Sequence, residues 1–285
     1  MKNNVNAYEN NGNGTFERNS AAELKGSSSI YFRIPASIIL DRDSDERRIS
    51  AFSFFSIRRG LDNSVTFTVN GMAKWLNKKP DRHAGGTNDK LAKETMNLAK
   101  LGYLSLSEKI GNTSEVDAVF NLSKVSEECT KDNFSIVYLD ELEKILKYDS
   151  KGTDAILLVF SYLRMRIARR RNKLFNEESS DKGEAHDIKS RQVRTPEAYD
   201  CYLYEMADEL GLSTRVVSNA VDALNEMKLI YSEQLPKTSN NGKWQTNRTI
   251  FCNWYKREKG SLFAYGKDYY MQEVKNKKIR LMKLK

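Results

Sequence analysis

Polar side chains gather at the amino-terminal end of a helix that the sequence predicts at residues 214–227. Thr214, Arg215, Ser218, Asn219 and Asp222 share one face of that helix. Arginine can bind guanine with two hydrogen bonds, and asparagine can bind adenine in the same way. A helix with these groups at its start is typical of a recognition helix in the DNA major groove. The alternative is a helical hairpin with a merely exposed polar face.

The residues around this helix predict how it is held. Its buried face is expected to consist of Val217, Ala220, Val221, Leu224 and Met227. Gly211 is expected to end a preceding short helix, Leu212 to fill the turn, and Ser213 to cap the next helix. The pattern therefore predicts a helix-turn-helix motif.

Other basic side chains are candidates for contacts to DNA phosphates. They are Arg169, Arg170 and Arg171 at the end of a helix expected at 154–172, Lys237, Lys243 and Arg248 in a long hairpin turn, Lys277 and Lys278 in the tail, and Lys78, Lys79, Arg82 and Lys93 in the first half. The arginines near residue 170 would serve equally as a solvated helix face. Trp244 is expected to pack against the hairpin more readily than to cap a base.

The first half contains a weaker version of the same motif. Thr87 is the expected cap of a helix at 88–101, and a longer turn precedes it. The outward face is expected to carry Asn88, Asp89, Ala92, Lys93, Met96 and Lys100. The amides of Gly85 and Gly86 could hold a phosphate, with a mobile surface loop as the alternative.

The sequence offers no pattern for catalysis or metal binding. The two histidines, His83 and His186, are far apart, and the three cysteines are also widely spaced. No phosphate-binding loop of the ATPase type occurs. We therefore expect no enzyme activity, no catalytic residue, no metal and no cofactor.

The net charge of +9 over 285 residues is unevenly distributed. Residues 1–150 hold 21 basic and 21 acidic residues, whereas residues 151–285 hold 26 basic and 17 acidic residues. A polyanion is the expected partner of the second half, with a solubilising surface as the alternative. No apolar run is long enough for a membrane span and no signal segment occurs, so we expect a cytoplasmic protein with no membrane partner.

An internal repeat underlies both halves. Residues 30–40 align with 136–146 at an offset of 106, and Met72-Ala73 align with Met206-Ala207 at an offset of 134. Each half predicts a helix (46–59; 154–172), a short strand (65–69; 199–203), a short helix, a longer helix (88–101; 214–227) and a hairpin (103–107 with 118–122; 229–233 with 249–253).

This order predicts a mostly α-helical α+β protein with small β hairpins, made of two tandem winged helix-turn-helix domains. The expected divisions are a disordered arm (1–28), a first winged-helix domain (29–130), a second winged-helix domain (131–258) and a basic tail (259–285).

Two winged helices with a leading IYFRIPASIIL segment and a basic tail resemble the replication initiator proteins of plasmids, phages and other mobile elements. The resemblance implies a bacterial protein that binds origin repeats in double-stranded DNA sequence-specifically, with the second unit as the main reader. The neutral first unit would bind DNA weakly, form a homodimer or contact host replication proteins. The alternatives are a transcriptional regulator and a replisome or helicase-loading accessory protein.

Overall fold

The computed structural model describes residues 30–41, 49–129, 133–148, 152–179, 198–234, 239–240, 243–244, 248–258 and 261–264, and it describes the side chains of the long helix only as far as Ile167. The expected disordered arm at 1–28 and the tail from residue 265 onward lie outside these ranges. Within the described ranges, helices and small antiparallel sheets alternate, which agrees with the predicted α+β class.

The first unit follows the expected order of elements. They are α2 (Ile49–Arg58), β2 (Ser64–Phe67), α3 (Val69–Trp75), α4 (Thr87–Lys100), β3 (Leu104–Leu106) and β4 (Val116–Phe120). All pairing in its sheet is antiparallel, in the order β2-β4-β3. The last strand of the unit, β4, thus lies in the centre of the sheet and pairs with both β2 and β3.

The second unit repeats this order. Its elements are α7 (Thr153–Ser179), β6 (Ala198–Cys201), α9 (Leu203–Glu209), α10 (Thr214–Glu226), β7 (Ile230–Gln234) and β10 (Thr249–Asn253). Its sheet has the order β6-β10-β7, in which β6, β10 and β7 correspond to β2, β4 and β3 of the first unit. The two halves therefore share one topology.

Helix ends at corresponding positions have the same backbone geometry. α3 is followed by Asn77 with φ of 55°, and α9 is followed by Gly211 with φ of 60°. The next amide after each, of Lys78 and of Leu212, donates to the carbonyl of Ala73 or of Ala207 at 2.9 and 2.8 Å. These bonds form a Schellman motif, which satisfies carbonyls that a helix end would leave unpaired. The repeat at an offset of 134 therefore extends to the hydrogen bonds of the turn.

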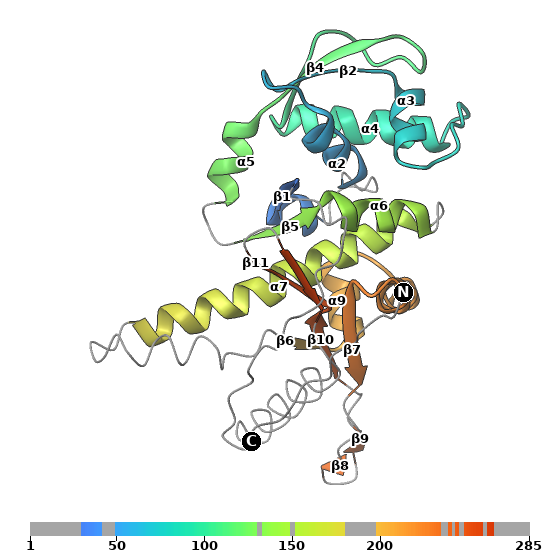
Figure 1. Cartoon of the computed structure of the whole chain (residues 1–285). Coiled ribbons are helices and arrows are strands. Elements are labelled where there is room, and N and C mark those ends of the chain that lie inside the picture. Colours follow the sequence, from blue (N-terminus) through green and yellow to red (C-terminus); the bar gives the residue numbers. More distant parts are fainter. Residues whose placement is uncertain are drawn as a thin grey trace, which may run out of the picture.

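A two-stranded ribbon joins the units (Figure 1). β1 (Tyr31–Pro35) precedes the first unit, β5 (Phe134–Tyr138) precedes the second, and the two pair antiparallel. Tyr31 pairs with Tyr138 and Phe32 with Val137, although Tyr31 aligns with Val137 and Phe32 with Tyr138 at the offset of 106. If each residue is replaced by its counterpart in the repeat, the pair Tyr31–Tyr138 becomes the pair Val137–Phe32. The ribbon therefore has the twofold symmetry of the repeat.

Short helices follow both strands of the ribbon. β1 leads into α1 (Ala36–Ile39) and β5 into α6 (Leu139–Tyr148). The amide of Leu139 donates to the carbonyl of Ile30 at 3.0 Å, so the start of α6 is bonded to the residue before β1. The repeated segments found in the sequence are therefore direct structural partners.

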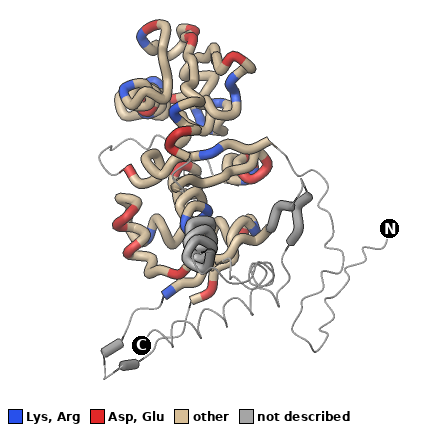
Figure 2. The backbone as a smooth tube through the Cα atoms, turned by 90° about the vertical axis from the view of Figure 1, so that its left-hand side faces the viewer, with Lys and Arg blue, Asp and Glu red and all other residues tan. Residues whose placement is uncertain are grey.

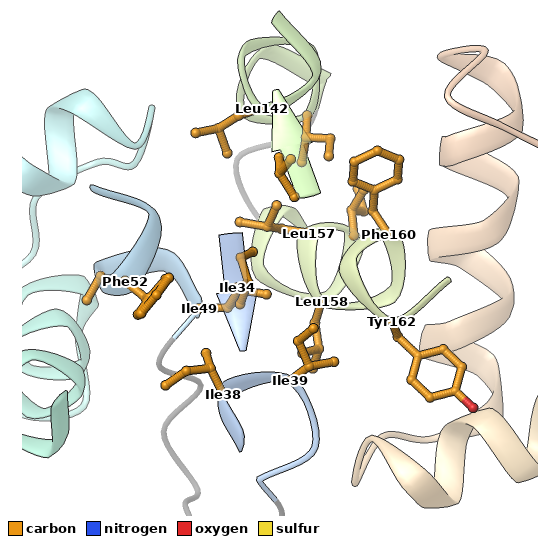
Figure 3. Packing of buried hydrophobic residues seen from close by; sticks show 14 of the residues in the cluster. Ile34, Ile38, Ile39, Ile49, Phe52, Leu142, Leu157, Leu158, Phe160 and Tyr162 are labelled. Atoms are coloured by element: carbon orange, nitrogen blue, oxygen red, sulfur yellow. The ribbon is translucent and has the colours of Figure 1, made fainter. Parts of the chain in front are cut away.

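The hydrophobic core runs through both units without interruption. Ile34 from β1, Ile49 and Phe52 from α2, and Leu157 and Phe160 from α7 are all buried, and the close view shows them around the ribbon (Figure 3). Burying such side chains contributes about 1.5–3 kcal/mol each. The junction between the units is thus a continuation of the core rather than a flexible link.

The remaining described elements were not predicted. They are α5 (Leu122–Cys129), β8 (Ser239–Asn240), β9 (Lys243–Trp244), β11 (Tyr255–Glu258) and β12 (Ser261–Ala264). α5 lies against β1, and β11 pairs with β12. Among the described helices, none is both long enough and apolar enough to cross a membrane.

Candidate nucleic-acid interface

The turn between α9 and α10 is built as the sequence predicts. Gly211 adopts a positive φ, which costs glycine no steric strain. The Ser213 hydroxyl accepts a hydrogen bond from the amide of Val216 at 3.3 Å and so caps α10. Leu212 is half-buried in the turn. These local interactions fix the start of α10 relative to α9.

The two faces of α10 also follow the prediction. Val217, Ala220, Val221 and Leu224 are buried, and Met227 packs against the core at the end of the helix. On the opposite face Thr214, Arg215, Asn219 and Asp222 are exposed, and Ser218 is half-buried. The first turn of α10 therefore presents its polar groups to solvent.

The predicted hairpin cation Arg248 does not extend freely from the protein. Its Nε lies 3.1 Å from Oδ2 of the buried Asp200, and its guanidinium lies over the ring of Tyr202 at 5.1 Å from the centroid. Tyr202 in turn stacks on Tyr204 at 5.3 Å, with 17° between the rings. Arg248 thus ends a stack of three side chains beside α9, with about a third of its own side chain exposed.

The other predicted contacts of this hairpin are described less fully. Lys243 and Trp244 form β9, which pairs with β8, and their side chains lie outside the described part. Lys237, Lys277 and Lys278 also lie outside it, and so does His186. The packing expected for Trp244 therefore stays a prediction.

Asn88 in α4 was predicted to face outward, and this prediction is wrong. The side chain is fully buried, and its Nδ2 donates to Oδ1 of Asn70 at 2.7 Å and of Asn112 at 3.3 Å. Its Oδ1 accepts from the amide of Asp81 at 3.2 Å. Asn88 is buried because it joins α3, the turn and the hairpin loop, which lie far apart in the sequence.

The turn before α4 also differs from the prediction. Gly86, not Thr87, is the cap residue, and Thr87 is the first residue of the helix. The amide of Gly85 donates to Oδ2 of Asp89 at 2.8 Å, and the amide of Gly86 donates to the carbonyl of His83 at 2.8 Å. The prediction that these two amides hold a phosphate is therefore wrong, because both already donate within the protein.

Lys78 points into the junction of the units. Its Nζ lies 2.5 Å from Oδ1 of Asp154 at the start of α7, and only 11% of its side chain is exposed. Its charge is therefore neutralised within the protein, and we leave it out of the proposed interface. By contrast Lys79, Arg82 and Lys93 are exposed, as predicted, with Lys93 paired to Asp89 at 3.2 Å.

The arginines of α7 were predicted to lie on its solvent side. Arg164 and Arg166 are instead mostly buried and paired, Arg164 with Glu141 at 3.8 Å and Arg166 with Glu209 of α9. Arg169, Arg170 and Arg171 belong to the same helix beyond Ile167, where side chains are not described. Their contact with phosphates stays a prediction.

The second half of the chain carries the excess of positive charge, but of the two helix-turn-helix segments it is the first that is basic and the second that is acidic. Residues 69–102 hold seven basic and three acidic residues, whereas the corresponding residues 203–228 hold two basic and five acidic residues. Figure 2 marks Lys and Arg in blue and Asp and Glu in red along the backbone of the described residues. The overall excess of the second half therefore does not come from its helix-turn-helix.

The described cysteines have the environment of structural residues. Burial raises the pKa of the Cys129 thiol to about 11 and of the Cys201 thiol to about 12. Thiols with such values hold little thiolate at neutral pH and are poor nucleophiles. In the part of the chain that the structure covers, no group of three or more His, Cys, Asp or Glu is arranged to hold a metal ion.

Comparison with known proteins adds little to this geometry. No protein-family model matches the chain, and no curated protein sequence matches it. Among solved structures, the crystal structure of RctB domains 2-3 (RctB-155-483) is similar over 82% of this chain and 90% of that chain, with a TM-score of 0.35 and 10% sequence identity. At that TM-score the likeness does not establish a shared fold or function.

Proposed function

We propose that this protein binds double-stranded DNA through two winged helix-turn-helix units. The observation that carries the proposal is the shared topology: helix, strand, two helices and a hairpin, with sheet orders β2-β4-β3 and β6-β10-β7. In this fold the second helix of the motif enters the major groove, and here α4 and α10 hold that position.

Within this proposal α10 reads the base sequence. Its first turn exposes Thr214 and Arg215, followed one turn later by Asn219, while the capped start of the helix holds them in place. Arg215 is suited to the O6 and N7 atoms of guanine, and Asn219 to the N6 and N7 atoms of adenine. The hairpin formed by β7 and β10 would act as the wing, with Lys237 and Lys243 beyond its described strands.

The biological role that we propose is that of a replication initiator of a plasmid, phage or mobile element, acting in the bacterial cytoplasm on repeated origin sites. Two units joined by a continuous core, each with its own helix-turn-helix, support the binding of an extended site by one molecule. A homodimer through the first unit and contacts to host replication proteins belong to the same proposal.

A mobility-shift titration tests the DNA-binding step. We expect the affinity for duplex DNA to fall steeply between about 50 and 200 mM salt, because bound phosphates release counterions. We expect Arg215→Ala to reduce discrimination between the selected site and its variants by about 1–3 kcal/mol. Equal loss on selected and random duplexes would remove α10 from the reading role.

Sequencing of genomic fragments bound by the protein tests the role. Iterated sites next to the gene for this protein would support an initiator. Sites scattered among promoters would instead indicate a transcriptional regulator, and recovery of helicase or primase without specific DNA would indicate an accessory protein.

A further inference from the structure

The charge of the two helix-turn-helix segments is reversed relative to their expected roles. Residues 203–228, which hold the proposed reading helix, have three more acidic than basic residues. Residues 69–102, in the unit that was expected to bind DNA weakly, have four more basic than acidic residues. A phosphate backbone attracts the second kind of surface and repels the first.

We infer that, among the described residues, the exposed basic face of α3, the following turn and α4 makes the main contact to the phosphates of duplex DNA. This inference rests on the proposed function and divides it between the units: the first unit supplies affinity, and α10 of the second supplies sequence preference. It reverses the expectation that the neutral first half contributes little.

Basic side chains lie along one side of α4. Lys90, Lys93 and Lys100 are all exposed, and their spacing, with Asn97 between the last two, puts them on one face of the helix. Lys79 and Arg82 in the turn before the helix are exposed as well, and so is Lys74 of α3. Six cations are thus exposed on this segment, of which Lys93 also pairs with Asp89, whereas Lys78 is mostly buried in its pair with Asp154.

The acidic residues of the same segment offset little of this charge. Glu94 is buried, and its Oε2 accepts from the amide of Ala51 at 3.0 Å. Asp89 accepts from the amide of Gly85 and pairs with Lys93. Asp81 is exposed and accepts from the amide of His83 at 3.1 Å. The outward face of the segment therefore stays positive.

The acidic residues of the second unit are placed differently. Asp208 of α9 and Asp222 and Glu226 of α10 are exposed, against two exposed cations, Arg215 and Lys228. Such a surface approaches DNA favourably only where Arg215 lies, at the start of α10. This arrangement favours a contact confined to base edges and explains why the phosphate contacts must come from elsewhere.

The test is a salt titration of duplex binding with a triple variant, Lys90→Gln, Lys93→Gln and Lys100→Gln. We expect the slope of log affinity against log salt to fall by about 2–3, since each phosphate contact contributes about 0.9. Specific and random duplexes should weaken alike, by tenfold or more, because phosphate contacts carry no sequence information. Glutamine has a similar helix propensity, so thermal unfolding should be unchanged.

A matched control removes the same charge elsewhere. Lys144, Lys147 and Lys228 are exposed on α6 and after α10, and their change to glutamine should leave the slope within about 0.5 of the unmodified protein. A second variant, Asp222→Asn, should tighten binding to every duplex. An equal fall in slope for both triple variants would show an effect of net charge alone and would overturn the inference.

The outcomes separate the inference from the proposed function. If the unmodified protein does not bind duplex DNA, the proposed function fails. If it binds with salt dependence and sequence preference, but the triple variant on α4 keeps the full slope, only the assignment of the first unit fails.

Discussion

The ammonium group of Lys78 and the carboxylate of Asp154 form an ion pair of 2.5 Å between the first helix-turn-helix and the start of α7 in the second unit. The hydroxyl of Ser50 on α2 also donates to Asp154. Close by, Nδ2 of Asn77 donates to the carbonyl of Leu146 in α6 at 2.7 Å. The turn of the first unit is therefore fixed to the second unit.

Removing one partner of this pair should destabilise the protein. We expect Asp154→Ala to lower the free energy of unfolding by about 1–3 kcal/mol, less than for a fully buried pair because about a third of the Asp154 side chain is exposed. A urea titration measures the change. The double variant Lys78→Met, Asp154→Leu should recover most of the loss, because no buried charge is then left unpaired.

An exposed ion pair provides the control. Lys147 and Glu143 of α6 lie 3.6 Å apart with most of their side chains in solvent. Glu143→Ala should change the unfolding free energy by less than about 0.5 kcal/mol. A loss from Asp154→Ala no larger than this would mean that the pair does not fix the units together.

The sequence predicts the parts of this fold whose signals are local. The period of Val217, Ala220, Val221 and Leu224 is that of one helix face, and Gly211 and Ser213 are strong stop and start signals, so α10 begins where it was expected. The Thr249–Asn253 strand was also predicted within its observed bounds.

The parts that were missed depend on distant partners. From its sequence position Asn88 was predicted to be exposed, because its hydrogen-bond partners Asn70 and Asn112 lie far from it in the chain. Residues 30–40 and 136–146 were found as a repeat, but they were not predicted to contain strands, and nothing local shows that β1 and β5 pair. α5 was not predicted because its sequence is mostly polar: only Val125 and Cys129 of that helix are buried, which is too few to show a helical period.

Lys228 should be a site where glycine stabilises the protein. It follows α10 with φ of 55°, whereas the corresponding residue after α4 is Gly102, with φ of 77°. A side chain in this conformation costs about 1–2 kcal/mol, partly offset by the greater freedom of glycine in the unfolded chain. We expect Lys228→Gly to raise the unfolding free energy by about 0.5–1 kcal/mol and Gly102→Ala to lower it by about 1 kcal/mol, both measured by thermal unfolding. A stabilising Gly102→Ala would contradict this account.

Alkaline pH should destabilise the second unit through two neighbouring phenols, one buried and one half-buried. The hydroxyls of Tyr162 and Tyr199 lie 3.0 Å apart, and burial raises the pKa of Tyr162 to about 12 and also raises the pKa of Tyr199. The unfolded chain loses these protons near pH 10, so the stabilisation is complete below pH 10 and is lost between about pH 10 and 12.

A pH series of unfolding temperatures measures this effect. Two pKa units at Tyr162 correspond to about 2–3 kcal/mol. We expect Tyr162→Phe to flatten the decline above pH 10, although it also loses a hydrogen bond to Glu209 at 3.1 Å. Tyr204→Phe, at a half-exposed position, should leave the decline unchanged. The same decline in all three proteins would exclude Tyr162 as its source.

Asn88 should be important for stability rather than for DNA contact. Asn88→Ala removes a fully buried amide that joins the half-buried Asn70, the exposed Asn112 and the amide of Asp81, which we expect to cost about 1–3 kcal/mol in a urea titration. Asn219→Ala, on the exposed face of α10, should cost less than about 0.5 kcal/mol. If the two substitutions cost the same, the buried amide network does not stabilise the first unit.

The ribbon of β1 and β5 also affects how the chain is made. During synthesis β1 emerges before the first unit, and the whole first unit follows before β5 is made. Until then β1 presents an open backbone edge to any complementary strand. At high concentration we therefore expect the β5 of a neighbouring molecule to compete for this edge, which would give a reciprocally swapped dimer.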